Sequence, residues 1–155
     1  MEWFVKAFLK AGLTWLVLGV TLGVAMAVYP EWAVYRTAHL HMNFLGFVTM
    51  MIYGVAYHVI PRFSGSALKY RQLAGLQWWI SNVGLALMVT GFVLRVSPET
   101  LVAGQIALGS GGAISACGGY AFAFNLWRTM DGQASSTAAM MPAPGNRPLP
   151  TVSAT

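Results

Sequence analysis

The stretch AHLHMNFLGFVTMMIYGVAYHVIPRFSG, from Ala38 to Gly65, holds all three histidines of the chain, two of them as a His-x-His pair. It begins the second of four long apolar segments, and it carries titratable side chains within its apolar run rather than at its margins. Ionisable groups are costly inside a membrane and normally need a partner there. The sequence therefore predicts that the chemistry of the protein lies in this segment.

The composition is that of a membrane protein. Hydrophobic residues make up 57% of the 155 positions and charged residues 8%, whereas a soluble domain carries about 25% charged residues. Mean hydropathy is +0.61. The net charge of +5 does not indicate nucleic-acid binding, because the basic residues are scattered at the ends of the apolar segments. The single Cys117 lies in an apolar run, so neither a disulfide framework nor a Cys-x-x-Cys site is expected.

The apolar segments predict an all-α membrane protein with four transmembrane helices, over residues 5–28, 38–61, 73–95 and 101–127. Each segment reaches the roughly 20 residues that a helix needs to cross a bilayer, and the alternation typical of strands is absent. Residues 1–128 are expected to form this transmembrane domain. Residues 129–155, rich in Gly, Ala, Ser, Thr and Pro, are expected to form a disordered cytoplasmic tail.

Lysine and arginine residues predict the orientation of the helices. They gather near the N-terminus, after the second segment and after the fourth, while the other two loops each carry one arginine, Arg36 or Arg95. Both termini are therefore expected on the cytoplasmic side of a bacterial cytoplasmic (inner) membrane. Lys6, Lys10 and the small residues 25–27 also imitate a secretory signal, but the apolar run exceeds the length that such a signal needs. We therefore expect a retained span.

Small residues predict close contacts between helices. The first helix carries a stripe of three glycines, Gly12, Gly19 and Gly23. The fourth carries many more small residues, among them Gly104, Gly109, Gly111, Gly112, Gly118 and Gly119.

Helical geometry separates the three histidines. Residues two apart on a regular helix point about 200° apart, so His39 and His41 lie on opposite faces. His58 follows 17 residues after His41, which is about 25 Å along a regular helix. The spacing therefore excludes a compact three-histidine metal site within one regular helix.

The two faces of this helix differ in kind. The face of His39 is small and polar and includes Asn43, Gly46, Met50, Gly54 and Tyr57. The face of His41 is apolar and includes Phe44, Leu45, Val48, Ile52, Val55 and Val59. One interpretation is that the first face packs inside a four-helix bundle and that His41 merely sits at the membrane interface. The other is that each face holds a flat porphyrin, whose iron takes axial imidazoles, with Asn43, Gly46 and Met50 beside it.

Four further side chains are candidates for supporting roles. Arg36, one turn before His39, and Arg95 are candidates for binding haem propionates, and the alternative is that they extend to lipid headgroups. Tyr57 and His58 are candidates for a proton or quinone site, and the alternative is that they cap helix packing.

These residues resemble a known family. The Ala38-His39-Leu40-His41 start, followed by Gly54, His58, Pro61, Phe63, Ser64 and Gly65, resembles the tenth transmembrane helix of haem–copper oxidase subunit I. In that family the first histidine of the pair ligates the high-spin haem and the second ligates the low-spin haem. The Arg36-x-x-His39 start is also similar to the second helix of nitric oxide reductases and related oxidases. The combined pattern also resembles NnrS-related bacterial membrane proteins.

The resemblance implies one part of a larger assembly. Subunit I has twelve helices in three arcs of four, whereas four helices are expected here. The histidines that bind copper in the oxidases have no counterpart, since the chain has only three histidines. A homotrimer of this chain would rebuild the twelve-helix ring. By carry-over from the family, His39 of one protomer and His41 of its neighbour would ligate the iron of one haem b per protomer.

Two axial histidines leave no open position on the iron, so the expected function is electron transfer by a membrane cytochrome rather than catalysis. The redox partner, a cytochrome or a quinol, is not identified by the sequence. One alternative is a five-coordinate haem that binds or reduces nitric oxide or oxygen. Another is a subunit without haem that serves in assembly.

Overall fold

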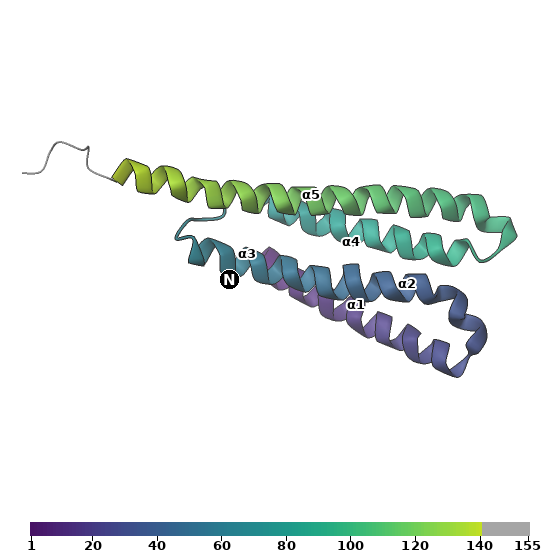
Figure 1. Ribbon diagram of the computed structural model, residues 1–155. Coiled ribbons are helices and arrows are strands. Elements are labelled where there is room, and N and C mark those ends of the chain that lie inside the picture. The colour runs from purple at the N-terminus through teal and green to yellow at the C-terminus, as the bar shows by residue number, and fades with distance from the viewer. Residues whose placement is uncertain (141–155) are drawn as a thin grey trace, which may run out of the picture.

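The computed structural model describes residues 1–140, with side chains described as far as Asp131. The chain forms two antiparallel helical hairpins that lie side by side (Figure 1). The first hairpin pairs α1 with the second span, which is made of η1, α2, η2 and α3, and the second hairpin pairs α4 with α5. The elements in order are α1 (Trp3–Val28), η1 (Pro30–Tyr35), α2 (Arg36–His41), η2 (Met42–Thr49), α3 (Met50–Phe63), α4 (Arg71–Leu94), η3 (Pro98–Thr100) and α5 (Leu101–Met140).

Four helices of the described chain are long and apolar enough to cross a membrane, namely Trp3–Val28, Pro30–Phe63, Arg71–Leu94 and Pro98–Asp131. The prediction of an all-α protein with four candidate membrane spans is confirmed. We call the end of the bundle that holds the N-terminus the terminal end. The opposite end, which holds the connections at residues 29–36 and 95–100, is the hairpin end (Figure 1).

The last helix continues past the residue at which the sequence predicted its end. α5 ends at Met140 rather than near residue 127, so residues 129–140 of the expected disordered tail are helical. A physical reason why the helix does not end near residue 127 is that Asn125 and Thr129, on either side of that point, are buried against the connection between α3 and α4. The remaining part of the expected tail, residues 141–155, lies outside the described residues.

The second span is continuous but not regular. Residues Met42–Thr49 form a π-helix between α2 and α3, immediately after the His-x-His pair. The hydroxyl of Thr49 donates to the carbonyl of Phe44, five residues back, at 2.8 Å. A π-helix of this length is rare, and such segments occur frequently at functional sites. The helix that the sequence predicts to be regular is therefore a π-helix in the segment that follows the two histidines.

The turn after α3 follows from one glycine. Gly65 has φ +60°, a left-handed conformation that glycine adopts without strain. Its N–H donates to the carbonyl of Arg62, and the N–H of Ser66 donates to the carbonyl of Pro61 at 3.1 Å. These two bonds satisfy carbonyls at the helix end and direct the chain toward α4.

Glycines set the packing of the second hairpin. A Cβ at Gly84 would lie 2.9 Å from the carbonyl oxygen of Gly111, and one at Gly111 would lie 2.7 Å from that of Gly84. Gly91 and Gly104 face each other in the same reciprocal way, at 2.8 and 3.0 Å. The two backbones are therefore in direct contact, as small residues allow in membrane helices, and Cα–H groups face carbonyl oxygens across the contact.

In the first hairpin, side chains fill notches left by glycines. Met51 lies over Gly12, so that a Cβ there would meet its sulfur at 3.2 Å. In the other direction, Trp15 of α1 lies over Gly46, where a Cβ would come within 2.5 Å of the tryptophan Cβ. The indole N–H of Trp15 then donates to the side-chain oxygen of Asn82 on α4 at 3.1 Å, which joins the two hairpins.

The apolar core between the hairpins lies at the terminal end. It is formed by side chains of α1, α3, α4 and α5, namely Phe4, Val5, Phe8, Met50, Tyr57, Ala74 and Leu126. Edge-to-face contacts link these aromatic rings, for example Phe4 with Tyr57 at a centroid distance of 5.7 Å. This cluster lies at the opposite end of the bundle from the His-x-His pair.

The contact between α4 and α5 predicts opposite effects for two neighbouring glycines. Gly111→Ala should lower the free energy of unfolding by about 1–3 kcal/mol, because its methyl group would overlap backbone atoms of α4. A methyl group at Gly112 would have no neighbouring atom within 4 Å. Gly112→Ala should therefore be neutral, or stabilising by up to about 1 kcal/mol. Denaturation in detergent, followed by far-UV circular dichroism, measures both, and equal effects would contradict the packing described.

Candidate functional site

His39 lies against two glycines of the first helix. Its Nδ1 is 2.8 Å from the carbonyl oxygen of Gly19 on α1. A Cβ at Gly23, one turn further along, would lie 2.8 Å from Cε1 of the imidazole. The ring is half-buried in this notch. The stripe of glycines on the first helix thus receives the first histidine of the pair.

Asn43 supports the same ring from one turn further along the span. Its amide nitrogen donates to the backbone carbonyl of His39 at 2.9 Å and lies 3.3 Å from Nδ1 of that ring. The amide group lies directly over Gly19, where a Cβ would come within 2.8 Å of it. The structure therefore brings two of the predicted site residues, His39 and Asn43, together against α1.

His41 faces the other hairpin. Its Nδ1 is 2.8 Å from the carbonyl oxygen of Thr37, one turn earlier on the same helix. Its ring lies 4.9 Å from the ring of Phe92 on α4, measured between centroids. The two rings of the His-x-His pair therefore lie on different sides of α2, as the spacing predicts. They cannot approach a common atom from this one helix.

Both histidines of the pair have the same hydrogen-bonding state. A carbonyl oxygen only accepts, so Nδ1 must carry the proton in His39 and in His41. A lone pair then remains on Nε2 when the ring carries only this proton; Nε2 of His39 lies 3.5 Å from the amide nitrogen of Asn43. Histidines that bind metals commonly donate their other ring N–H to a backbone carbonyl in this way, which fixes the tautomer and the ring orientation.

His58 has a different environment, near the terminal end. The guanidinium nitrogen Nη1 of Arg62 contacts both of its ring nitrogens and lies 2.8 Å from Nδ1. The neighbouring Tyr57 is 3% exposed, and its hydroxyl donates to the side-chain oxygen of Gln77 at 2.7 Å. Both residues line a cavity of about 230 Å³, but their polar groups have separate partners.

The remaining predicted site residues lie apart from the two imidazoles. Gly46 receives Trp15 and Leu85, and Met50 is buried in the core at 2% exposure. Arg36 and Arg95 are exposed near the hairpin end. No ion pair involves either arginine among the residues whose side chains are described.

Sequence reasoning missed an apolar groove between the two hairpins at the hairpin end. Its volume is about 420 Å³. The second span contributes Ala38 and Met42, which lie between the directions of His39 and His41 around α2. The signal in the sequence was Ala38, a small residue one turn before Met42 on the helix face between the two histidines. The other lining residues are Leu18, Thr21, Leu22, Ala25, Trp32, Tyr35, Val89 and Val93.

Metal-binding side chains do not gather in the described part of the chain. It contains no cluster of three or more His, Cys, Asp or Glu side chains with positions suited to a metal ion. The donor chemistry of this site is therefore that of separate imidazoles, each able to supply one bond to a metal centre that has further ligands.

Fold and site together define a class: a multi-pass membrane protein whose second span carries two imidazoles, each with Nδ1 bonded to a backbone carbonyl. The chain is similar to cytochrome c oxidase subunit 1 of Rhodobacter capsulatus, with 25% identity over 129 residues, covering 68% of this chain and 24% of that protein. It is also similar to the Cbb3-type cytochrome c oxidase subunit CcoN1 of Stutzerimonas stutzeri, with 26% identity over 129 residues, covering 68% of this chain and 27% of that protein.

The predicted resemblance to haem–copper oxidase subunit I is thus confirmed as a distant relationship. The chain spans about a quarter of the length of these curated relatives. No protein-family model matches it.

The tautomer assignment is directly testable. Nitrogen-15 NMR of the imidazole rings in detergent-solubilised protein, at mildly alkaline pH where imidazole is neutral, should show Nδ1–H and unprotonated Nε2 for His39 and His41. His58 serves as the internal control, because its nitrogens face a donor from Arg62 rather than a carbonyl. An Nε2–H signal from either ring of the pair would contradict the assignment.

Proposed function

We propose that the chain is a b-type haem-binding membrane protein that transfers electrons. The observation that carries this proposal is the shared state of His39 and His41. Both donate Nδ1–H to a backbone carbonyl at 2.8 Å, which leaves the lone pair of Nε2 as the atom that can bind a metal. Haem iron is commonly held by neutral imidazole, and the distant relatives are subunits of cytochrome c oxidases.

An apolar groove near the two imidazoles, which neither of them lines, supports a flat, largely apolar ligand. The groove beside Ala38 and Met42 has apolar walls and lies between the hairpins. Arg36 and Arg95 are exposed at the same end of the bundle and are proposed to bind the propionates of the group. Asn43, one turn further along the span, donates to the backbone carbonyl of His39. When bound, haem supplies one-electron oxidation and reduction at its iron.

One chain cannot complete the ligand set that we propose. The two imidazoles lie on different sides of α2, and we propose that the second ligand of each haem comes from another copy of the chain. We propose a homotrimer of twelve helices, in which His39 of one protomer and His41 of its neighbour ligate the same iron. An exposed apolar stripe on the second span, made of Phe44, Val48, Ile52 and Val55, is available for such a contact.

The electron-transfer role follows from this ligand set. The imidazoles of His39 and of a neighbour's His41 would hold the haem, and the chemistry that it would supply is electron transfer rather than activation of oxygen or nitric oxide. We place both termini in the cytoplasm of a bacterial inner membrane, because basic residues gather at the terminal end. The His-x-His pair then lies near the outer surface.

The cavity at His58 is a candidate proton or quinone site within this proposal. Arg62, Glu2 and Arg71 line it together with His58, so its wall carries charges of both signs. Tyr57 contributes its ring, while its hydroxyl is bound to Gln77. The cavity lies near the end of the bundle opposite to the His-x-His pair, which argues for proton entry rather than direct electron exchange with that pair.

The haem proposal predicts a spectrum and its dependence on two residues. The purified protein should give the reduced-minus-oxidised difference spectrum of a six-coordinate b-type haem. Substitution of a residue that only supports a metal ligand lowers affinity by roughly 10–100-fold. His39→Ala and His41→Ala remove a ligand itself, so each should lower the haem content by more than that. His58→Ala is the matched control and should retain haem, because His58 is bonded to Arg62. A colourless wild-type protein would instead favour an assembly subunit.

Carbon monoxide distinguishes the ligation states. Added to the reduced protein, it should leave the spectrum unchanged, because neither axial position is open. A carbon monoxide shift would contradict bis-histidine ligation and favour a five-coordinate haem that binds nitric oxide or oxygen.

Ligation between subunits predicts that two inactive variants complement each other. Co-expressed His39→Ala and His41→Ala protomers should regain haem at about one site in three within each mixed trimer, since one interface there joins an intact His39 to an intact His41. The measurement is haem content of mixed complexes isolated through two different affinity tags. Mixed complexes without haem, from a wild type that binds haem, would show that each site needs both histidines of one chain.

A further inference from the structure

A groove at the terminal end has no role in the proposed redox site. It has a volume of about 690 Å³ and lies where the connection after α3 enters α4, beside α5. Its walls include Lys69, Tyr70, Arg71, Leu73, Leu76 and Phe124. We call it the Lys69 groove.

The backbone of this groove is held in place by two buried side chains of α5. Asn125 is 0% exposed; its amide nitrogen donates to the carbonyl of Tyr70 at 2.9 Å, and its oxygen accepts from the N–H of Tyr70 at 3.2 Å. Thr129 is 2% exposed and accepts from the N–H of Lys69 at 3.1 Å. Burial of such polar groups is costly without these bonds, so the connection is fixed against α5.

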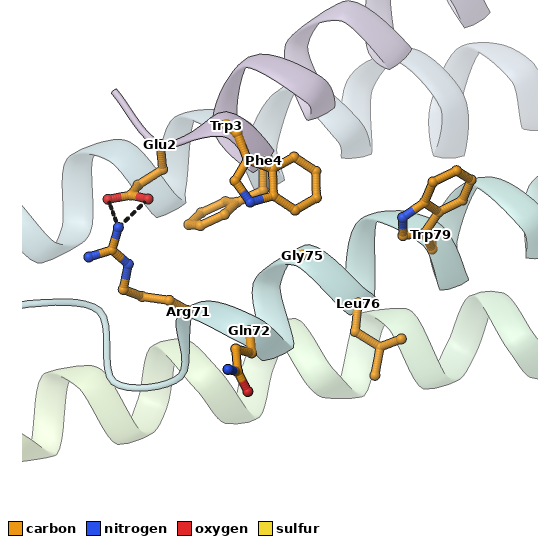
Figure 2. A pocket seen from close by; sticks show the side chains of 8 residues that line it. All are labelled: Glu2, Trp3, Phe4, Arg71, Gln72, Gly75, Leu76 and Trp79. Atoms are coloured by element: carbon orange, nitrogen blue, oxygen red, sulfur yellow. Dashed lines mark hydrogen bonds and ion pairs between the residues drawn. The ribbon is translucent and has the colours of Figure 1, made fainter.

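One wall of the groove is aromatic and apolar. The rings of Tyr70 and Phe124 are stacked, with centroids 5.7 Å apart and planes inclined by 16°. Further into the span, the side chains of Leu76 and Phe124 are about half-exposed, at 55% and 52%. Figure 2 shows Leu76 on the opposite side of α4 from Trp3 and Phe4 of α1. This wall faces the region that acyl chains occupy around a membrane span.

The opening of the groove carries one uncompensated positive charge. Arg71 is paired with Glu2 on α1 at 2.5 Å (Figure 2). Lys69 has no carboxylate partner among the residues whose side chains are described, and its Nζ lies 5.9 Å from the ring centre of Tyr70. The candidate span Arg71–Leu94 begins at Arg71, two residues after Lys69, so we place both cations where the bilayer meets water.

We propose that the Lys69 groove binds one anionic phospholipid. The phosphate lies beside Lys69 and Arg71, and an acyl chain follows Leu73, Leu76 and Phe124. A phosphodiester carries one negative charge, which matches the single uncompensated charge of the groove. Basic residues close to the membrane surface contribute about 1 kcal/mol each to the binding of anionic lipid. An uncharged isoprenoid quinone would gain nothing from Lys69.

The experiment compares two lipids with identical acyl chains. Phosphatidylglycerol or phosphatidylcholine is added to the purified full chain in neutral detergent, and native mass spectrometry and thermal denaturation report binding. Phosphatidylglycerol should bind as one retained molecule and raise the denaturation temperature. Lys69→Gln should weaken this binding about fivefold, and Lys69→Arg should restore it. Lys6→Gln, at an exposed lysine of α1, is the matched control and should bind as the wild type does.

Three results would overturn the proposal. They are equal binding of phosphatidylcholine, an equal loss in the Lys6→Gln control, and the same stabilisation by glycerol phosphate without acyl chains. The last would identify a free phosphate site instead of a lipid site. None of these results depends on haem content, so the lipid site and the redox proposal fail or stand separately.

Discussion

The structure depends on glycines that let helices approach more closely than side chains would allow. Lipid tails are as apolar as the helices they surround, so membrane helices associate through close packing and hydrogen bonds rather than through burial from water. The second hairpin uses direct backbone contact, with Gly84 against Gly111. The first hairpin uses notches, and two of these, at Gly19 and Gly23, are filled by Asn43 and His39.

This packing determines the chemical state of the site. A notch at Gly19 brings a helix carbonyl within 2.8 Å of the His39 ring, and that carbonyl accepts the proton on Nδ1. His41 reaches the same state through the carbonyl of Thr37 on its own helix. His58 faces a guanidinium donor instead, which separates it chemically from the pair. For His39, a contact that holds the first hairpin together thus also places the proton on Nδ1, whereas for His41 a contact within its own helix does so.

The aromatic core and the His-x-His pair lie at opposite ends of the bundle. The aromatic core around Phe4, Phe8 and Tyr57 closes the terminal end, and Asn125 fixes the connection between the hairpins there. At the hairpin end, an apolar groove remains between α1, α2 and α4. A π-helix separates this end from α3. The half of the second span that carries the His-x-His pair therefore lies apart from the aromatic core.

The sequence by itself determined the spans and the directions of the histidines, because composition sets the solvent and helical periodicity sets where each side chain points around its own axis. Only the tertiary structure decided the neighbours of those side chains. Gly46 receives Trp15, and α5 continues to Met140 beside the connection that Thr129 binds. These outcomes depend on the register between helices. That register is set by contacts between residues far apart in the chain, so no periodicity within one segment encodes it.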